Sequence, residues 1–250
     1  MGSGDELMLT GHVRELQQKD PRKVRLAYER PTHWNAVFDH NPRIATIGEQ
    51  GDFQVLVPRT NGLRPYCERK MPDRWFWKPY TPLVGELYFQ PEELDFAAKF
   101  TPDVVIEPNL KGGASPNKDW GAKNWFALIQ MMRAEGILPV QLGPAGTRKF
   151  HGAQFVETPT FRMACAVLAR ARAGVLHEGG LHHAAAVVNV RSVVIYGGYI
   201  GPEHTGYQLH RNLTAGGKPC GMRLPCNHCA RAMQKITPEQ VLAELKAIRA

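Results

Sequence analysis

The stretch that decides the fold class is 174–188, GVLHEGGLHHAAAVV. Residues 174–177 are typical of a buried strand, and Glu178-Gly179-Gly180 has the composition of a turn. We expect a helix over 181–188 and a further strand over 192–196, SVVIY. A strand, a turn, a helix and another strand form a βαβ unit, so this part of the chain predicts a parallel sheet with helices on its faces.

The same alternation continues around this stretch. Strands are predicted at 103–107 and 137–142, and helices at 124–134 and 161–172. The series is that of a doubly wound domain. Residues 236–250 predict a final helix, in which Thr237 is the N-cap, Pro238 takes the first helical position and Gln240 completes a capping box.

The first hundred residues carry a weaker form of the pattern. Leu7, Val13 and Leu16 recur near helical spacing. The other expected elements are strands at 23–28, 43–47 and 53–57 and a short helix at 34–40. Residues 58–100 are rich in Pro, Tyr and Trp, and there we expect loops and short helices. We favour aromatic packing under a long loop over a surface that faces an acceptor.

Composition limits the function classes. The chain has 250 residues, 43% of them hydrophobic and 22% charged, which suits one large or two small α/β domains and argues against disorder or a coiled coil. We find no secretion signal and no apolar run near the ~18 residues of a membrane span, so we expect a cytoplasmic protein. The net charge of +8 favours anionic partners: nucleotide sugars, phosphorylated lipids, membrane surfaces or nucleic acid.

Three segments have the residues of an anion or sugar site, which a sheet of this kind places where strands lead into helix N-termini. The first is Gly2-Ser3-Gly4-Asp5. Its glycines allow the backbone to approach a ligand closely, and Asp5 can act as a general base on an acceptor hydroxyl. On spacing alone we favour Asp5 as the cap of its own helix.

The second segment is the loop 111–120, KGGASPNKDW. A glycine-rich loop with two lysines suits a diphosphate, and Lys118 can neutralise charge on a nucleotide leaving group. The loop is not a Walker A motif, because no Gly-Lys-Ser/Thr stands at the required spacing. A solvated basic loop is the alternative interpretation.

The third segment is 176–183, LHEGGLHH. Its paired glycines let a helix N-terminus approach a diphosphate, and Glu178 can accept hydrogen bonds from sugar hydroxyls. His182 and His183 are adjacent and so point in different directions on a helix, whereas a metal-binding pair shares one face. We therefore expect no catalytic metal and a role for one histidine in binding phosphate or sugar.

Residues 175–186 resemble the donor-binding motif of the ADP-heptose:lipopolysaccharide heptosyltransferases, glycosyltransferase family 9. That motif runs from an acid through a glycine to a histidine and an alanine-rich helix. Glu178 stands in place of the usual aspartate, Gly180 at the glycine and His183 at the histidine.

Two further segments are similar to the same family. Residues 117–125 match its Lys-x-Trp-Pro-x-x-x-Trp stretch, with Lys118 on the phosphate-binding lysine and Gly121 where proline is usual. Residues 2–10 look like its Gly-Asp-x-Leu loop, in which the aspartate, here Asp5, is the proposed catalytic base. The chain begins at this loop without the family's usual first strand.

The resemblance implies an α/β GT-B fold, in which two Rossmann-like domains face each other across a cleft, here with a reduced N-terminal domain. It implies an acceptor-side domain at 1–98, a nucleotide-sugar domain at 99–235 and a C-terminal helix at 236–250. It also implies an inverting, metal-independent transfer with no cofactor, in which Asp5 takes the acceptor proton while Lys118 stabilises the departing nucleotide diphosphate. The donor-binding residues that we expect are Gly4, Lys111, Gly143, Glu178, Gly179, Gly180, Leu181 and His183.

The function that follows is transfer of a sugar from a nucleotide sugar, such as ADP-heptose, to a saccharide or lipid-linked acceptor at the inner membrane surface. Two alternatives stay open. One keeps the chemistry but uses a nucleic-acid base or a protein as acceptor. The other is a GT-B protein that binds a nucleotide sugar without catalysis, which the replacement at Glu178 motivates and the presence of Asp5 and Lys118 opposes.

Three of the five cysteines cluster near the C-terminus, at Cys220, Cys226 and Cys229. An odd number of cysteines argues against a disulfide framework. A Cys-x-x-Cys pair with a third thiol, and with His228 and His204 nearby, suggests a structural zinc but is an incomplete motif. Of the two interpretations we favour reduced thiols in a loop before the final helix.

Overall fold

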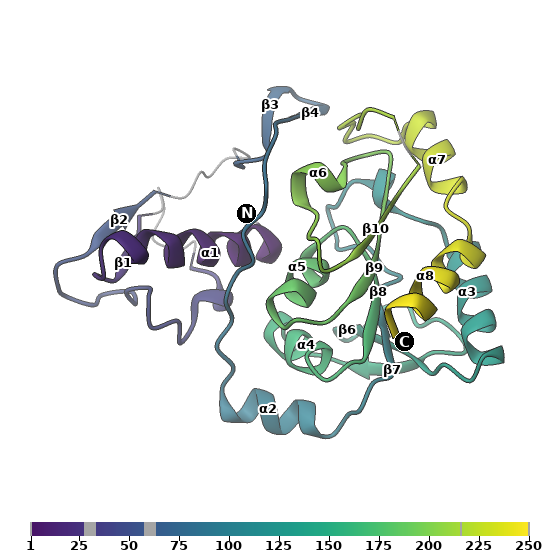
Figure 1. Ribbon diagram of the computed structural model, residues 1–250, viewed down its shortest axis with the longest axis horizontal. Coiled ribbons are helices and arrows are strands. Elements are labelled where there is room, and N and C mark those ends of the chain that lie inside the picture. Colours follow the sequence, from purple (N-terminus) through teal and green to yellow (C-terminus); the bar gives the residue numbers. More distant parts are fainter. Residues whose placement is uncertain (1, 28–33, 58–63, 216, 250) are drawn as a thin grey trace.

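A six-stranded, all-parallel sheet is the centre of the computed structural model, which describes residues 2–27, 34–57, 64–215 and 217–249 (Figure 1). The strands are β5 (Val104–Ile106), β6 (Pro139–Gly143), β7 (Gln154–Glu157), β8 (Ala173–His177), β9 (Ser192–Gly197) and β10 (Arg211–Thr214). Their order across the sheet is β10-β9-β8-β5-β6-β7. The first strand of the sheet, β5, is therefore central. The chain continues through β6 to the edge strand β7, then returns to β8 and continues through β9 to the other edge strand, β10, which is the doubly wound arrangement.

Helices cover both faces of this sheet because its strands are apolar on both sides. Val105 of β5 belongs to one core cluster, whereas Val104 and Ile106 belong to the other, as the period of two in a strand requires. One face carries α4 (Phe161–Leu168) and α5 (Gly180–Val187), and the other carries α3 (Ala122–Ala134) and α8 (Pro238–Arg249).

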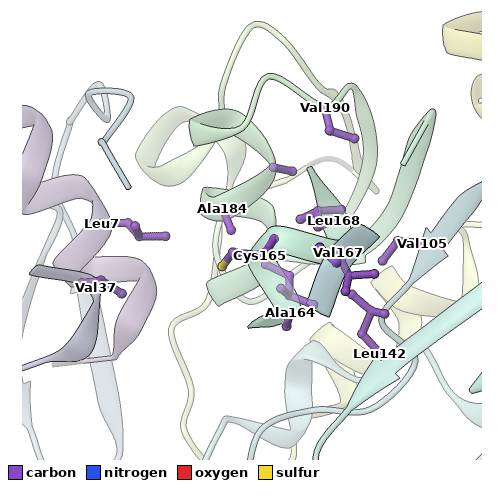
Figure 2. Packing of buried hydrophobic residues seen from close by; sticks show 14 of the residues in the cluster. Leu7, Val37, Val105, Leu142, Ala164, Cys165, Val167, Leu168, Ala184 and Val190 are labelled. Atoms are coloured by element: carbon purple, nitrogen blue, oxygen red, sulfur yellow. The ribbon is translucent and has the colours of Figure 1, made fainter. Parts of the chain in front are cut away.

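The residues before the sheet form a smaller unit. It contains α1 (Ser3–Lys19), the 3-10 helix η2 (Ala36–Phe38), and the parallel pair β1 (Val24–Leu26) and β2 (Gln54–Leu56). Leu7 of α1 and Val37 of η2 join the same core cluster as α4 and α5, so the first core continues from the sheet into the small unit (Figure 2).

The strand expected at 43–47 is wrong. Only Ile44 makes a bridge, to Val24. Turns on both sides use the backbone groups that a strand would need, because the N–H of Ile44 donates to the carbonyl of Asn41 and that of Glu49 to the carbonyl of Thr46. Part of the strand expected at 23–28 lies outside the described residues, and so does 58–63 of the loop region.

A hairpin that was not expected follows, made of β3 (Cys67–Met71) and β4 (Arg74–Trp77). It lies against the large unit, since the indole N–H of Trp77 donates to the carbonyl of Tyr199 at 2.9 Å and the amide of Trp75 donates to the carbonyl of Gly221 at 2.9 Å. Aromatic packing in this region is confirmed, because Tyr66 stacks on Trp77 with ring centroids 6.3 Å apart.

The final helix begins as expected, with the hydroxyl of Thr237 accepting from the amide of Gln240 at 3.3 Å. The strands β7 and β10 and the short helices α2 (Pro91–Ala98), α6 (Pro202–Thr205) and α7 (Asn227–Gln234) had not been expected individually. The domain limits at 98/99 and 235/236 stay predictions. Within the described ranges, no helix is both long and apolar enough to cross a membrane.

A buried ion pair joins α4 to α2 and to the small unit. Arg162 contacts both carboxylate oxygens of Glu93, at 2.6 and 2.7 Å, and donates to the carbonyls of Ala36 and Tyr88. The side chains of Arg162 and Glu93 are only 6% and 12% exposed. Since removing one partner leaves the other charge buried and unpaired, this contact is costly to break.

We expect Arg162→Ala to lower the free energy of unfolding by about 3–5 kcal/mol, measured by urea denaturation. Arg22→Ala, which removes an arginine from an exposed pair with Asp20, is the matched control and should change stability far less. Equal effects of the two substitutions would show that the Arg162 contact does not join these elements.

Candidate functional site

The strand order alone indicates where a ligand-binding site is expected. In an open parallel sheet, ligands bind beyond the carboxyl ends of the strands where the winding reverses, which here is between β5 and β8. Glu107 follows β5, and His177 and Glu178 stand at the end of β8. These side chains, and the loops that lead into α3 and α5, therefore lie at the edge of the sheet where a ligand is expected.

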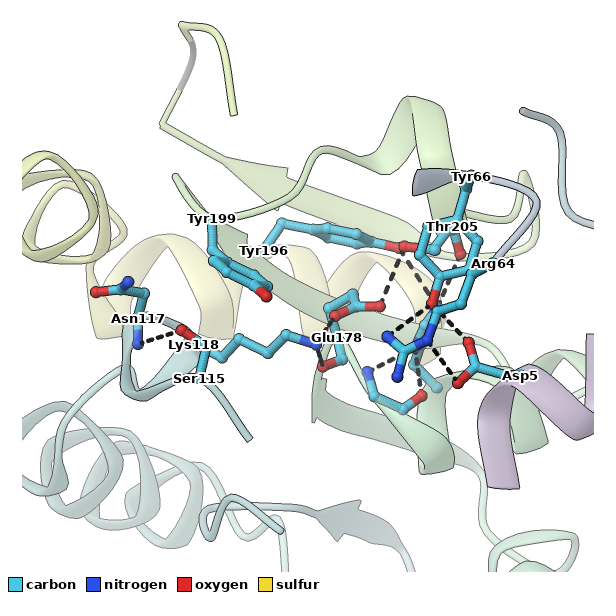
Figure 3. Close-up of polar contacts among 12 residues, drawn as sticks. Asp5, Arg64, Tyr66, Ser115, Asn117, Lys118, Glu178, Tyr196, Tyr199 and Thr205 are labelled. Carbon is cyan, nitrogen blue, oxygen red and sulfur yellow. Dashed lines mark hydrogen bonds and ion pairs between the residues drawn. The ribbon is translucent and has the colours of Figure 1, made fainter. Parts of the chain in front are cut away.

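An ion pair between Lys118 and Glu178 lies at this edge (Figure 3). Lys118 ends the short helix η3 (Pro116–Lys118), and its ammonium also lies 5.4 Å from the ring centroid of Tyr199. The other carboxylate oxygen of Glu178 accepts from the hydroxyl of Thr205 at 3.2 Å. Burial alone would raise the pKa of Glu178, but the charge of Lys118 and these hydrogen bonds more than offset burial and lower the pKa, so the carboxylate is ionised.

The histidines of the first turn of α5 hold the local backbone. His182 Nδ1 is 2.9 Å from the amide of Gly179, and its Nε2 is 2.9 Å from the carbonyl of Thr205. His183 Nδ1 is 2.8 Å from the hydroxyl of Tyr207. Burial lowers the pKa of both imidazoles, so both are neutral near pH 7.

The N-terminus of α1 meets the N-terminus of α5. A Cβ added at Gly4 would lie 2.5 Å from Cδ2 of His183 and 3.3 Å from Cα of Gly180. Only glycine therefore allows this approach. Because the free N–H groups and partial positive charge of a helix lie at its N-terminus, two such ends converge beside the carboxyl edge of the sheet.

Asp5 stands in the first turn of α1, with its side chain 7% exposed (Figure 3). Its Oδ2 accepts from the amide of Gly2 at 2.9 Å, so Asp5 does cap its helix, but from the third helical position, and Gly2 is the N-cap residue. The same oxygen lies 3.2 Å from Nε of Arg64, and Oδ1 accepts from the hydroxyl of Tyr66 at 2.6 Å. The carboxylate thus caps its helix and is also held from a second segment, which leaves Oδ1 with one lone pair unused.

Two buried polar atoms at the sheet edge lack a hydrogen-bond partner within the described part of the chain: Oε2 of Glu107 and Nδ1 of His177. Burial, and then the charge of Glu178, raise the pKa of Glu107 to about 8 against the opposing effect of Lys118. Burial lowers the pKa of His177 to about 4. A buried polar group without a partner is rare in native structures and calls for an explanation, such as a bound water or ion or a catalytic role.

Glu178, His182 and His183 offer ligand atoms within 4.8 Å of one another, which is close enough for a metal ion. The ammonium of Lys118, however, already pairs with the carboxylate of Glu178, and His182 uses both of its nitrogens on the backbone. The contacts in this cluster are those of a charge-compensated, hydrogen-bonded network.

The structure brings most of the sequence-predicted residues together. Lys111 is exposed at the start of the loop 111–120, and its ammonium lies 4.0 Å from the position of a Cβ on Gly2. Gly143 ends β6 at the same edge of the sheet, where the Thr147 side chain packs against it. Leu181 faces the first core cluster, so only its backbone is available to a ligand.

Sequence reasoning missed Arg64, Tyr66 and Thr205. Tyr66 lies 61 positions from Asp5 in the chain, and Arg64 stands two residues before Tyr66. No local sequence motif connects either residue with Asp5. A signal was present only in composition, because the segment around them is rich in aromatic and basic residues.

Comparison with protein-family models and with curated protein sequences finds no match to this chain. Solved structures do match it. A glycosyl transferase family 9 protein from Veillonella parvula is 14% identical with a TM-score of 0.66, over 100% of this chain and 95% of that one. The ADP-heptose lipopolysaccharide heptosyltransferase II of E. coli is 22% identical with a TM-score of 0.52, over 69% of this chain.

The chain has a GT-B fold. A third structure, the iron-containing dodecameric glycosyltransferase TibC of enterotoxigenic E. coli, is 16% identical with a TM-score of 0.50. The match spans 55% of heptosyltransferase II and 49% of TibC, about half of each. The expected fold class is confirmed: the C-terminal unit is a doubly wound sheet of six parallel strands, and in the described residues before it the strands form only the parallel pair β1–β2 and the hairpin β3–β4.

The contact of Gly4 with His183 predicts a steric effect. We expect Gly4→Ala to lower the free energy of unfolding by about 1–3 kcal/mol, because α1 must move away from α5. Gly112→Ala, where a Cβ meets no atom within 4 Å, is the control. The cost of Gly4→Ala should shrink in a His183→Ala background, and full additivity of the two substitutions would contradict the contact.

Glu107 predicts a pH dependence of stability. Folded Glu107 keeps its proton up to about pH 8, whereas the unfolded residue loses it near 4.5, so the native state binds more protons between these values. This residue therefore makes the free energy of unfolding fall as pH rises through that range. The stability of Glu107→Gln relative to the unmodified protein should rise from pH 5 to pH 8 in urea titrations. A difference that does not change with pH would show that Glu107 is ionised throughout.

Proposed function

We propose that this protein is a glycosyltransferase that moves a sugar from a nucleotide sugar to an acceptor hydroxyl. The observation that carries the proposal is the position of Asp5 at the meeting point of α1 and α5, opposite the Lys118–Glu178 pair at the reversal point of the sheet. The candidate base comes from the small unit and the candidate phosphate-binding lysine from the large one. The GT-B fold of the matching glycosyltransferases supports the same reading.

The chain's residues suit a direct displacement. Asp5 takes the proton of the acceptor hydroxyl as the oxygen attacks the anomeric carbon, and Oδ1 has the free lone pair for this proton. The C–O bond to the nucleotide diphosphate breaks, and the diphosphate leaves with the electron pair. Attack from the face opposite the leaving group inverts the anomeric configuration.

Negative charge develops on the leaving diphosphate, and a lysine and the N-terminus of a helix lie where they can stabilise this charge. Lys118 is 19% exposed and can shift from Glu178 toward a phosphate oxygen, while the free amides at the start of α5 donate to the others. Glu178, freed from the ammonium, then accepts from sugar hydroxyls. The transfer requires no metal in this scheme, because lysine and the helix N-termini supply the positive charge.

We further propose ADP-heptose as donor and a lipopolysaccharide core sugar as acceptor, at the cytoplasmic face of the inner membrane. The donor named for heptosyltransferase II supports this choice, and the net charge of +8 suits anionic substrates and lipid surfaces. The non-catalytic alternative is favoured by Glu178, which replaces the aspartate of the family that the sequence resembles.

The donor class is testable by thermal stabilisation with ADP, GDP, UDP and CDP sugars. A ligand at about 100 times its dissociation constant adds about 2.7 kcal/mol of stability, so a selective shift names the nucleotide. Absence of any shift would contradict donor binding altogether.

We expect Asp5→Asn to lower kcat by about 10²–10⁴-fold with little change in the dissociation constant of the donor, because the amide has nearly the same shape as the carboxylate but cannot take a proton. Single-turnover kinetics and calorimetric donor titration measure the two quantities. Donor binding with no turnover in the unmodified protein as well would favour the non-catalytic alternative. Turnover that survives the substitution would show that Asp5 is not the base.

Lys118→Ala should weaken donor binding and lower kcat/KM, whereas Lys123→Ala, an exposed lysine on α3, should change neither. Unfolding experiments accompany the kinetics, because Lys118→Ala also leaves the buried Glu178 unpaired. Equal kinetics for the two variants would exclude Lys118 from the donor site.

A further inference from the structure

Three thiols and an imidazole converge on one point outside the proposed donor site. The Sγ of Cys220 lies 3.7 Å from that of Cys226 and 3.0 Å from that of Cys229, and Nδ1 of His228 lies 3.9 Å from the Sγ of Cys229. All four ligand atoms lie within 4.8 Å of one another. A tetrahedral ion with metal–sulfur bonds of about 2.3 Å places its ligand atoms about 3.8 Å apart, which this spacing approaches.

The local fold explains the convergence. Cys226 is the N-cap of α7 and Cys229 lies in the first turn, so their thiols face the same side three residues apart. Cys220 reaches the same point from the preceding loop. The sulfurs already accept backbone N–H groups, from Met222 to Cys220 at 3.4 Å and from Cys229 to Cys226 at 3.5 Å. These hydrogen bonds orient the sulfurs toward the shared point.

The fourth ligand is held in place by a glycine. A Cβ added at Gly198 would lie 2.9 Å from Cε1 and 3.1 Å from Nδ1 of His228. The absence of a side chain at Gly198 therefore makes room for the imidazole beside the thiols. Of the two histidines near the cysteines in the sequence, His228 is therefore the one grouped with the three thiols.

We propose that Cys220, Cys226, His228 and Cys229 bind one metal ion, Zn²⁺ or Fe²⁺, and that this ion fixes the loop that carries Lys118. Three thiolates and one imidazole form a closed structural set of the kind that holds zinc, and iron suits the same soft ligands. The thiols that are protonated in the free protein release their protons on binding. The binding step itself does not rest on the proposed transferase function.

The connection to Lys118 runs through its neighbour Asn117, a buried residue that bonds to the cysteine loop on three sides. Its side-chain amide donates to the carbonyls of Met222 and Leu224, both at 2.6 Å, and its carbonyl oxygen accepts from the amide of Cys226 at 3.0 Å. An ion that fixes residues 220–229 therefore fixes the position from which Lys118 reaches the donor site.

The test begins with elemental analysis of untagged protein purified without chelator. We expect about one equivalent of zinc or iron per chain, and the element found names the ion. Cys226→Ser should lose the ion while keeping its circular dichroism spectrum, because Cys226 is only half-buried. Cys165→Ala is the matched control and should keep the ion, because Cys165 is a buried cysteine of the first core cluster and lies outside the proposed ligand set.

Cobalt provides a second measurement that does not depend on what the cells supplied. Reduced, metal-free protein should take up one Co²⁺ with sulfur-to-cobalt charge-transfer absorption and the d–d bands of a tetrahedral site. This absorption should weaken in Cys226→Ser. Folded protein that carries no ion and binds neither Zn²⁺ nor Co²⁺ would overturn the proposal, and so would an intact mass two hydrogens lower, which would reveal a disulfide.

Hydrogen exchange tests the connection to Lys118 without any substrate. Removal of the ion should speed amide exchange in 115–118 and leave α3 unchanged. If the transferase proposal also holds, removal of the ion should raise the dissociation constant of the donor in the unmodified protein more than in Lys118→Ala. Unchanged exchange in a protein that does bind the ion would overturn the connection while leaving the metal site intact.

Discussion

The close approach of α1 to α5 at Gly4 is the constraint on which the rest of the arrangement depends. With a Cβ at this position only 2.5 Å from His183, any other residue would move α1 outward, and Asp5 with it. The first hydrophobic core crosses the same junction, since Leu7 of α1 packs in one cluster with Ala184 and Ala185 of α5. The position of the carboxylate is thus set by core packing as well as by its own contacts with Gly2, Arg64 and Tyr66.

Charge compensation is a second principle of the site. Glu178 and Lys118 are both largely buried, and each makes the burial of the other tolerable. Such a pair contributes little net stability but leaves a cation and an anion at the carboxyl edge of the sheet, where the proposed transfer would use both. Glu107, which lacks a charged partner of its own in the described residues, instead keeps its proton. The same edge of the sheet therefore holds carboxyl groups in two protonation states.

The sequence was sufficient for the centre of the sheet and insufficient for its margins. The strands β8 (AGVLH) and β9 (SVVIYG) are buried along their whole length and mostly apolar, so they were predicted within one or two residues. The edge strands β7 (QFVE) and β10 (RNLT) were missed because one side of an edge strand faces solvent and the composition becomes polar. Asp5, Lys118 and Glu178 stand in recognisable local patterns, whereas Tyr66 reaches Asp5 through a long-range contact that no spacing reveals.

The hairpin at 67–77 belongs to both units at once. Tyr66 is tied to its base by the hydrogen bond from the Lys78 amide at 2.8 Å, and Trp75 and Trp77 fasten it to the large unit. If the small unit swung away from the sheet while the hairpin stayed behind, Asp5 would part from the Tyr66 hydroxyl and recover it only on return. Opening and closing would then change both the hydrogen bonding of the Asp5 carboxylate and its distance from the sheet. Motion between the two units would in this way be coupled to the reactivity of that one side chain.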